Sequence, residues 1–304
     1  IAMASLALSL GSALIVMGDA WILKLIAAPL LGAGFGGLSM SFNTLFVTYF
    51  SQKNAGLLNV LNATYGLGAV AAPWLLSQGL LSGGQLFAFI AVLSLVVMLG
   101  AWNIDDRVPN TAIVQDGNAE LLRIYPLLVT AFLMLFLEAG LTYWLPSLLS
   151  TSSSGEGIAA AYMSQFFFWF VIVRLSAAAL ATWVTTLGFA LCGLVGISLS
   201  LGAVLVGAVA LADTSFTGAF MGLIFPNAYA WMLKTGGGGT STGARVLLSA
   251  IAGATVGPWV LGWILPIGGQ ASVLWVLGLV STLAATVMVI TELNARKYRS
   301  MRSQ

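Results

Sequence analysis

The sequence predicts an all-α integral membrane protein that contains about ten transmembrane helices. Three observations lead to this fold class. First, 60% of the 304 residues are hydrophobic and 7% are charged, whereas a soluble domain carries about 25% charged residues. Second, the mean hydropathy of the chain is +1.02. Third, the apolar runs are continuous over about 18 residues or more, which favours helices over the alternating strands of an outer-membrane barrel.

Polar and turn-rich positions divide the chain into ten apolar stretches, and each is interpreted as one span of about 20 residues. The stretches are residues 1–18, 22–50, 56–80, 86–103, 122–149, 157–181, 184–212, 215–233, 244–265 and 272–293. The sixth and seventh are separated only by a weak break around Thr182 to Gly188. Without that break, the two termini would lie on opposite sides of the membrane.

The first stretch lacks the basic start of a signal peptide and precedes a second apolar run, so it is interpreted as a true span. The chain begins at Ile1, inside that span. We therefore expect its natural beginning to lie upstream.

The basic residues predict the orientation, because short loops rich in lysine and arginine stay on the cytoplasmic side. One side of the ten-span arrangement holds Lys53, Arg107, Arg123, Lys234, Arg245, Arg296, Lys297, Arg299 and Arg302. Lys24 falls on the opposite side, and Arg174 lies within a span. We expect both ends of the chain to be cytoplasmic.

The longest polar segment, residues 103–120, separates four spans from six. It predicts an N-terminal bundle (1–103, incomplete, four spans), a cytoplasmic linker (104–121) and a C-terminal six-helix bundle with a short cytoplasmic tail (122–304). An internal repeat supports this division. Phe35-Gly36-Gly37-Leu38 reappears as Phe220-Met221-Gly222-Leu223, and residues 68–74 reappear as 253–259, both at an offset of 185 residues.

The repeat pairs the first three spans with the seventh, eighth and ninth. The first two spans of the second half then have no counterpart, so we expect two further spans before Ile1. Six plus six spans in the same orientation, joined by a cytoplasmic linker, is the architecture of major facilitator transporters.

Five elements carry a further resemblance: Gly34-Phe35-Gly36 before Asn43, residues 58–68 followed by Pro73, residues 138–146, Gly222 with Phe225-Pro226, and Gly253 with Gly257-Pro258 and Gly262. They occur in an order similar to that of the major facilitator superfamily, in its fucose permease and sodium-glucose transporter-like branch. The likeness extends over essentially the whole chain. It implies a major facilitator fold, lacking its first two helices, and transport of a sugar by alternating access.

Two positions depart from that branch. Its members commonly carry histidine where this chain has Asn62, and Ser39 stands where fucose permeases have an acidic residue four positions before the asparagine. A proton-coupled fucose mechanism therefore does not transfer directly.

Glu138 lies near the middle of an apolar span, where a charged group costs about 2.5 to 3.5 kcal/mol on insertion scales. Such a residue usually faces a cavity or a partner, so we expect Glu138 to couple transport to a proton or sodium ion. Thr142 lies one turn further on the same face. The alternative is a buried structural carboxylate.

Candidate solute-binding residues carry side-chain amides, which offer both donors and acceptors to hydroxyl groups. Asn59, Asn62 and Tyr65 share one side of a helix, and the aromatic ring could cover the apolar face of a sugar. The other candidates are Asn43, Gln165 and Asn227. For all of them, hydrogen bonding between helices is the alternative role.

Arg174 lies toward the cytoplasmic end of its span, where it could act as a gate or extend its charge to the membrane surface. Trp144, Trp169 and Trp231 could line a cavity or take packing or interfacial roles. Gly32 to Gly37 formally match a dinucleotide-binding motif, but they lie inside an apolar helix. They instead indicate close approach of helices.

Most enzyme classes are disfavoured because the chain has no histidine and one cysteine, Cys192. It cannot form a Ser-His-Asp triad, a histidine-ligated metal site or an internal disulfide. We expect a monomeric, multi-pass protein of the plasma membrane that contacts lipid and a small polar solute, with no metal, no nucleic-acid partner and no cofactor beyond a coupling ion. The competing hypothesis is a non-transporting scaffold or receptor derived from a transporter.

Overall fold

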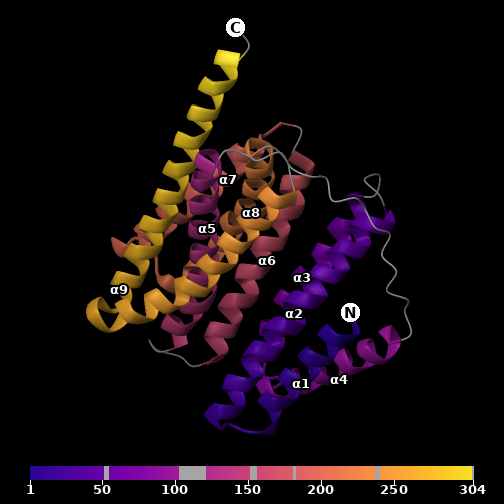
Figure 1. The fold of residues 1–304 in the computed structure, drawn as a ribbon. Helices are drawn as coiled ribbons and strands as arrows, with labels where there is room; N and C mark the ends of the chain where they lie inside the picture. Colours follow the sequence, from indigo (N-terminus) through magenta and orange to yellow (C-terminus); the bar gives the residue numbers. More distant parts are fainter. Residues whose placement is uncertain (51–54, 103–120, 151–155, 181–182, 237–239, 303–304) are drawn as a thin grey trace. The chain divides into compact units, whose positions relative to one another are not determined.

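The computed structural model describes residues 1–302 apart from 51–54, 103–120, 151–155, 181–182 and 237–239, and regular structure in these residues is entirely helical (Figure 1). The predicted all-α fold is confirmed. In chain order the helices are α1 (Ala2–Met17), α2 (Trp21–Phe50), α3 (Ala55–Ser77), α4 (Gly83–Ala101), α5 (Leu121–Leu149), α6 (Glu156–Leu180), α7 (Thr186–Leu205), a short 3₁₀ helix η3 (Leu211–Phe216), α8 (Thr217–Thr235) and α9 (Thr240–Arg302).

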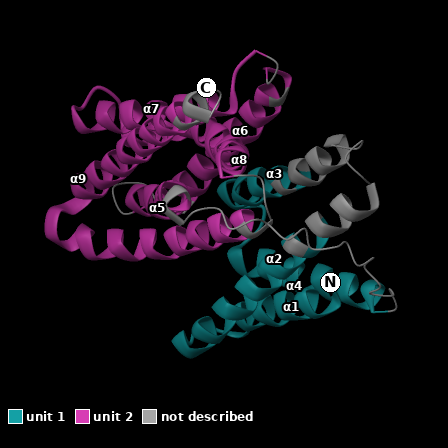
Figure 2. Ribbon diagram, turned by 45° about the horizontal axis from the view of Figure 1, so that its top comes forward, with its two compact units in different colours: residues 1–111 teal, residues 112–304 magenta. Residues whose placement is uncertain are grey.

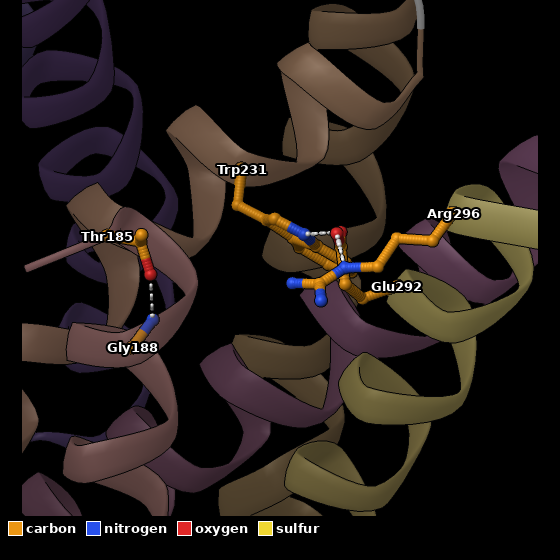
Figure 3. Close-up of polar contacts among 5 residues, drawn as sticks. All are labelled: Thr185, Gly188, Trp231, Glu292 and Arg296. Atoms are coloured by element: carbon orange, nitrogen blue, oxygen red, sulfur yellow. Dashed lines mark hydrogen bonds and ion pairs between the residues drawn. The ribbon is translucent and has the colours of Figure 1, made fainter. Parts of the chain in front are cut away.

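The weak break predicted between the sixth and seventh stretches is confirmed. Helix α6 ends at Leu180, and α7 begins after Thr185, whose hydroxyl accepts a hydrogen bond from the Gly188 amide at 3.1 Å (Figure 3). This side-chain cap satisfies an amide that has no partner within the helix. Helix α7 ends at Leu205, short of the predicted residue 212, because a turn with Gly207 at φ 75° precedes η3.

The last two predicted stretches both lie in α9, whose helical backbone is interrupted at Gly269. The backbone there has φ 66° and ψ −163°, a conformation that glycine adopts readily because it has no Cβ. The interruption falls between the predicted stretches 244–265 and 272–293, but the number of membrane crossings remains a prediction.

Apolar side chains cover the outside of the helices as well as the inside. Leu199, Leu248 and Leu279 are 67–70% exposed, although water-facing positions of a soluble helix are typically polar. Six described segments are long and apolar enough to cross a bilayer: Trp21–Ser39, Gly83–Ala101, Ile124–Leu149, Gly157–Ala177, Thr186–Leu205 and Thr242–Lys297. The chain is therefore a multi-pass integral membrane protein.

The chain divides into two compact units, Ile1–Thr111 and Ala112–Gln304 (Figure 2). The predicted linker, residues 104–121, lies almost wholly outside the described residues. In the first unit, α1 packs against α2 and α4. A Cβ atom at Gly34 would lie 2.5 Å from the Leu8 amide nitrogen, and the Ser9 hydroxyl donates to the Ala91 carbonyl at 2.9 Å. Small and hydroxylated residues thus join these helices, as expected in a membrane.

In the second unit, two helix pairs pack closely by placing glycines against phenylalanine backbones. On α9, a Cβ at Gly253 or Gly257 would overlap the carbonyl oxygen of Phe132 or Phe136 of α5. On α8, a Cβ at Gly218 or Gly222 would likewise overlap the carbonyl oxygen of Phe166 or Phe170 of α6. These contacts bring α9 onto α5 and α8 onto α6, and α7 packs against α8 and α9.

Candidate functional site

Glu138 lies on the interior face of α5. Met134, Leu141 and Leu145 stand four residues before it and three and seven after it, so they share its face, and each is at most 1% exposed. Glu138 is itself half-buried. The Thr142 hydroxyl donates to the Glu138 backbone carbonyl at 2.8 Å, so the predicted neighbour serves the helix backbone and not the carboxylate.

Arg174, on α6, is held by contacts with two helices. Its Nε donates to the Gly222 carbonyl of α8, with a nitrogen-to-oxygen distance of 3.4 Å. Its Cζ lies 4.2 Å from the centre of the Phe170 ring, one turn earlier on α6, which is within cation–π range. The guanidinium also interacts electrostatically with Glu138 of α5. The two charged residues singled out in the sequence therefore belong to one centre, formed by α5, α6 and α8.

The sequence of α8 explains why its backbone accepts a hydrogen bond from Arg174. In an α-helix the Gly222 carbonyl would bond the amide of residue 226, but that residue is Pro226, which has no N–H. The absence of a side chain at Gly222 also lets α6 approach, since a Cβ there would lie 2.5 Å from the Phe170 carbonyl oxygen.

Two predicted solute-binding amides, Gln165 and Asn227, have different surroundings. Gln165 is exposed on α6, and its Oε1 accepts a hydrogen bond from Ser215 of η3 at 3.0 Å. Asn227 is half-buried, and its Nδ2 donates to the Leu223 carbonyl of its own helix at 2.8 Å. That second bond follows the pattern by which short polar side chains satisfy helix backbone.

The remaining candidates lie in the first unit, Asn43 on α2 and Asn59, Asn62 and Tyr65 on α3. Their side chains lie outside the described residues, so their predicted role in solute binding stays a prediction.

Of the three tryptophans singled out in the sequence, Trp231 is buried at 4% exposure. Its Nε1 donates to Glu292 at 3.0 Å, and Arg296 forms an ion pair with the other carboxylate oxygen at 2.8 Å (Figure 3). Trp231 therefore joins α8 to α9. Trp169 is 41% exposed on α6.

Trp144 contributes to an aromatic groove of about 790 Å³ between α5 and the first half of α9. Its Nε1 donates to the Pro258 carbonyl at 3.0 Å, which holds its ring in place. The lining residues are Tyr143, Trp144, Pro258, Trp259, Gly262, Trp263, Pro266 and Ile267. The rings of Tyr143, Trp259 and Trp263 are 61–67% exposed.

Sequence reasoning missed the backbone acceptor at Gly222, the hydroxyl of Ser215 and the aromatic groove. A signal for the first exists in the sequence, because a proline four residues after Gly222 leaves that carbonyl without a helical donor. The groove had a weaker signal in Trp259 and Trp263, which are one turn apart.

Comparison with known proteins identifies the fold. No protein-family model and no curated protein sequence matches the chain, whereas 17 solved chains match it in structure. One is the crystal structure of a Major Facilitator Superfamily transporter, FucP, in the outward conformation. It has a TM-score of 0.66 and 18% sequence identity, over 97% of this chain and 80% of that chain. The chain therefore has the fold of the major facilitator superfamily, as its sequence predicts.

Proposed function

We propose that this protein is a secondary active transporter that moves a small polar solute across a membrane by alternating access. The observation that carries the proposal is a charged centre, Glu138 with Arg174, inside a bundle with the major facilitator fold. Ionisable residues within the membrane are costly and commonly belong to ion or substrate pathways. The similar structure FucP is a transporter of the same fold.

In this mechanism the two bundles rock about a central solute site, and the electrochemical gradient of a proton or sodium ion drives the cycle. Glu138 is the coupling residue, since its charge changes when it binds a cation. Solute is bound by Asn43, Asn59, Asn62, Tyr65, Gln165 and Asn227. Ser215 accompanies Gln165, because its hydroxyl occupies the amide oxygen and leaves the amide nitrogen for a solute hydroxyl.

A sugar is the proposed solute class. The resemblance to the fucose permease and sodium-glucose transporter-like branch favours it, and the aromatic groove supplies a physical argument. Exposed rings such as those of Trp259 and Trp263 present flat apolar surfaces that suit the apolar face of a sugar ring.

The coupling role is tested by uptake of a radiolabelled sugar panel into proteoliposomes that contain the full-length protein, under imposed sodium or proton gradients. With Glu138→Gln, we expect gradient-driven uptake to fall by about tenfold or more, while exchange of solute at equal gradients continues. The charge change that links ion to solute is lost, but the solute site remains.

The matched control is Asp213→Asn, which removes a carboxylate from the exposed start of η3 and should leave uptake unchanged. Full gradient-driven uptake by Glu138→Gln would contradict the coupling role. A folded wild-type protein that moves no member of the panel under either gradient would contradict sugar transport, and if it also moves no other solute the non-transporting hypothesis is favoured.

The sugar proposal is tested separately with Trp263→Ala, which removes an exposed ring from the groove. We expect the KM for sugar uptake to rise by about fivefold to tenfold, since stacking contacts contribute about 1 kcal/mol. Trp275→Ala, which removes a ring that is 65% exposed on the second half of α9, is the control. Equal KM values for the two variants would show that the groove does not contact the sugar.

A further inference from the structure

Helix α8 contains a backbone carbonyl, that of Gly222, for which its own sequence supplies no helical N–H donor. Pro226 removes the amide that would bond the Gly222 carbonyl, and prolines inside helices are common sites of bending. An unpaired carbonyl inside a membrane bundle is costly because no water is present to bond it. The donor for this carbonyl comes from another helix, since Arg174 Nε lies 3.4 Å from the Gly222 oxygen.

Contacts with α6 and α8 help to position the guanidinium. The Phe170 ring lies beneath Arg174 Cζ at 4.2 Å. Phe170 is also the residue whose backbone Gly222 approaches most closely, so the same pair brings α6 and α8 together. The guanidinium, bonded to the backbone of α8, also interacts electrostatically with the Glu138 carboxylate of α5.

An arginine has five N–H donors in a planar group, so one guanidinium can serve several acceptors at once. A carboxylate attracts these donors more strongly than a neutral carbonyl does. The Gly222 carbonyl and the Glu138 charge therefore both attract one guanidinium.

We propose that Arg174 is a positioning residue that supplies the hydrogen bond that Pro226 cannot donate, and that it passes changes in the Glu138 charge to the segment of α8 around Pro226. When Glu138 binds a cation, its pull on the guanidinium weakens, and Arg174 binds the Gly222 carbonyl more firmly. Loss of the cation reverses the change. This inference rests on the proposed function, since it takes Glu138 as the group that binds the coupling ion.

The first test asks whether Arg174 serves the carbonyl that Pro226 exposes. It is a double-mutant cycle of Arg174→Gln and Pro226→Ala in the full-length protein, read by thermal unfolding in detergent. Pro226→Ala restores the helical amide for Gly222. Arg174→Gln should therefore lower Tm by several degrees when Pro226 is present and by clearly less in the Pro226→Ala background. Equal losses in both backgrounds would overturn the assignment.

The second test asks whether the Glu138 charge reaches α8. Amide hydrogen exchange is measured over α8 in the wild type, Glu138→Gln, Arg174→Gln and the double variant, with α7 of the same molecules as internal reference. Glu138→Gln mimics the neutral carboxyl group and should slow exchange around residues 222–230 severalfold, whereas it should have no such effect once Arg174 is replaced. The same slowing with and without Arg174 would contradict the proposal.

Both tests are independent of transport, so they separate this proposal from the proposed function. If the double-mutant cycle shows coupling between Arg174 and Pro226 in a protein that moves no solute, the hydrogen bond from Arg174 to Gly222 is supported. The coupling role of Glu138 is then contradicted. Arg174→Lys distinguishes geometry from charge, because it keeps the cation but lacks the planar donor group. In the Arg174→Lys variant, Glu138→Gln should slow amide exchange over α8 by less than it does in the wild type.

Discussion

At the residue scale, a single carboxylate joins two helices. Glu292 of α9 has a side chain that is 14% exposed, and it accepts hydrogen bonds from Trp231 of α8 and Arg296 of α9. A partly buried carboxylate is tolerated when its oxygens are bonded and its charge is paired. Trp231 therefore has a bonding role that the distribution of tryptophans along the sequence did not reveal.

We expect Trp231→Phe to destabilise the protein by about 1.5 to 3 kcal/mol, the range for a hydrogen bond to a charged group. Phenylalanine preserves most of the buried ring but has no N–H for Glu292. Thermal unfolding in detergent is the measurement, and Trp183→Phe, at a side chain that is 82% exposed, is the control. Equal stability of the two variants would mean that the Trp231 bond contributes nothing.

The sequence singled out Glu138 and Arg174 because a charge inside an apolar span is conspicuous. It did not reveal the hydrogen-bond acceptor of Arg174, since Gly222 is 48 residues away in the sequence and lies on a different helix. Contacts of this kind depend on how the helices pack, and local hydropathy carries no information about that packing.

At the element scale, glycine pairs determine how closely the helices approach. In the sequence, Gly253 and Gly257 belong to the internal repeat and to the family resemblance, and the structure places both glycines against the backbone of α5. The spacing of the glycines was visible in the sequence. Their partners, Phe132 and Phe136, were not, because nothing local to α9 specifies which helix occupies the space.

Gly253→Ala should destabilise the protein by about 1 to 3 kcal/mol, because the added methyl group would overlap the Phe132 carbonyl and force α9 away from α5. Gly278→Ala, elsewhere on α9, is the matched control, since a Cβ there meets nothing within 4 Å. Thermal unfolding of both variants gives the comparison. A larger loss at position 278 would contradict the packing argument.

At the scale of the whole molecule, the internal repeat and the run of polar residues predicted a protein of two halves. The chain has two compact units, and the matched segments lie in helices of different units, α2 and α3 in one and α8 and α9 in the other.

The predicted orientation has a direct test with single cysteines in a Cys192→Ser background. A membrane-impermeant maleimide should label Gln78→Cys, between α3 and α4, in intact cells. It should label Lys297→Cys on α9 only after the membrane is permeabilised, because the basic tail is predicted to be cytoplasmic. Labelling of both sites in intact cells would show that the predicted number of spans between them is wrong.

The amino-acid sequence by itself determined the membrane class, the helical segments, most of their ends and the residues whose charge is out of place. These follow from hydropathy, helix-breaking residues and the cost of burying charge, all of which are properties of neighbouring residues. The tertiary structure decided that Arg174 bonds the Gly222 carbonyl, that Trp231 bonds Glu292 and that an aromatic groove forms between α5 and α9. Those arrangements join residues from different helices, and they exist only once close packing has selected which faces meet.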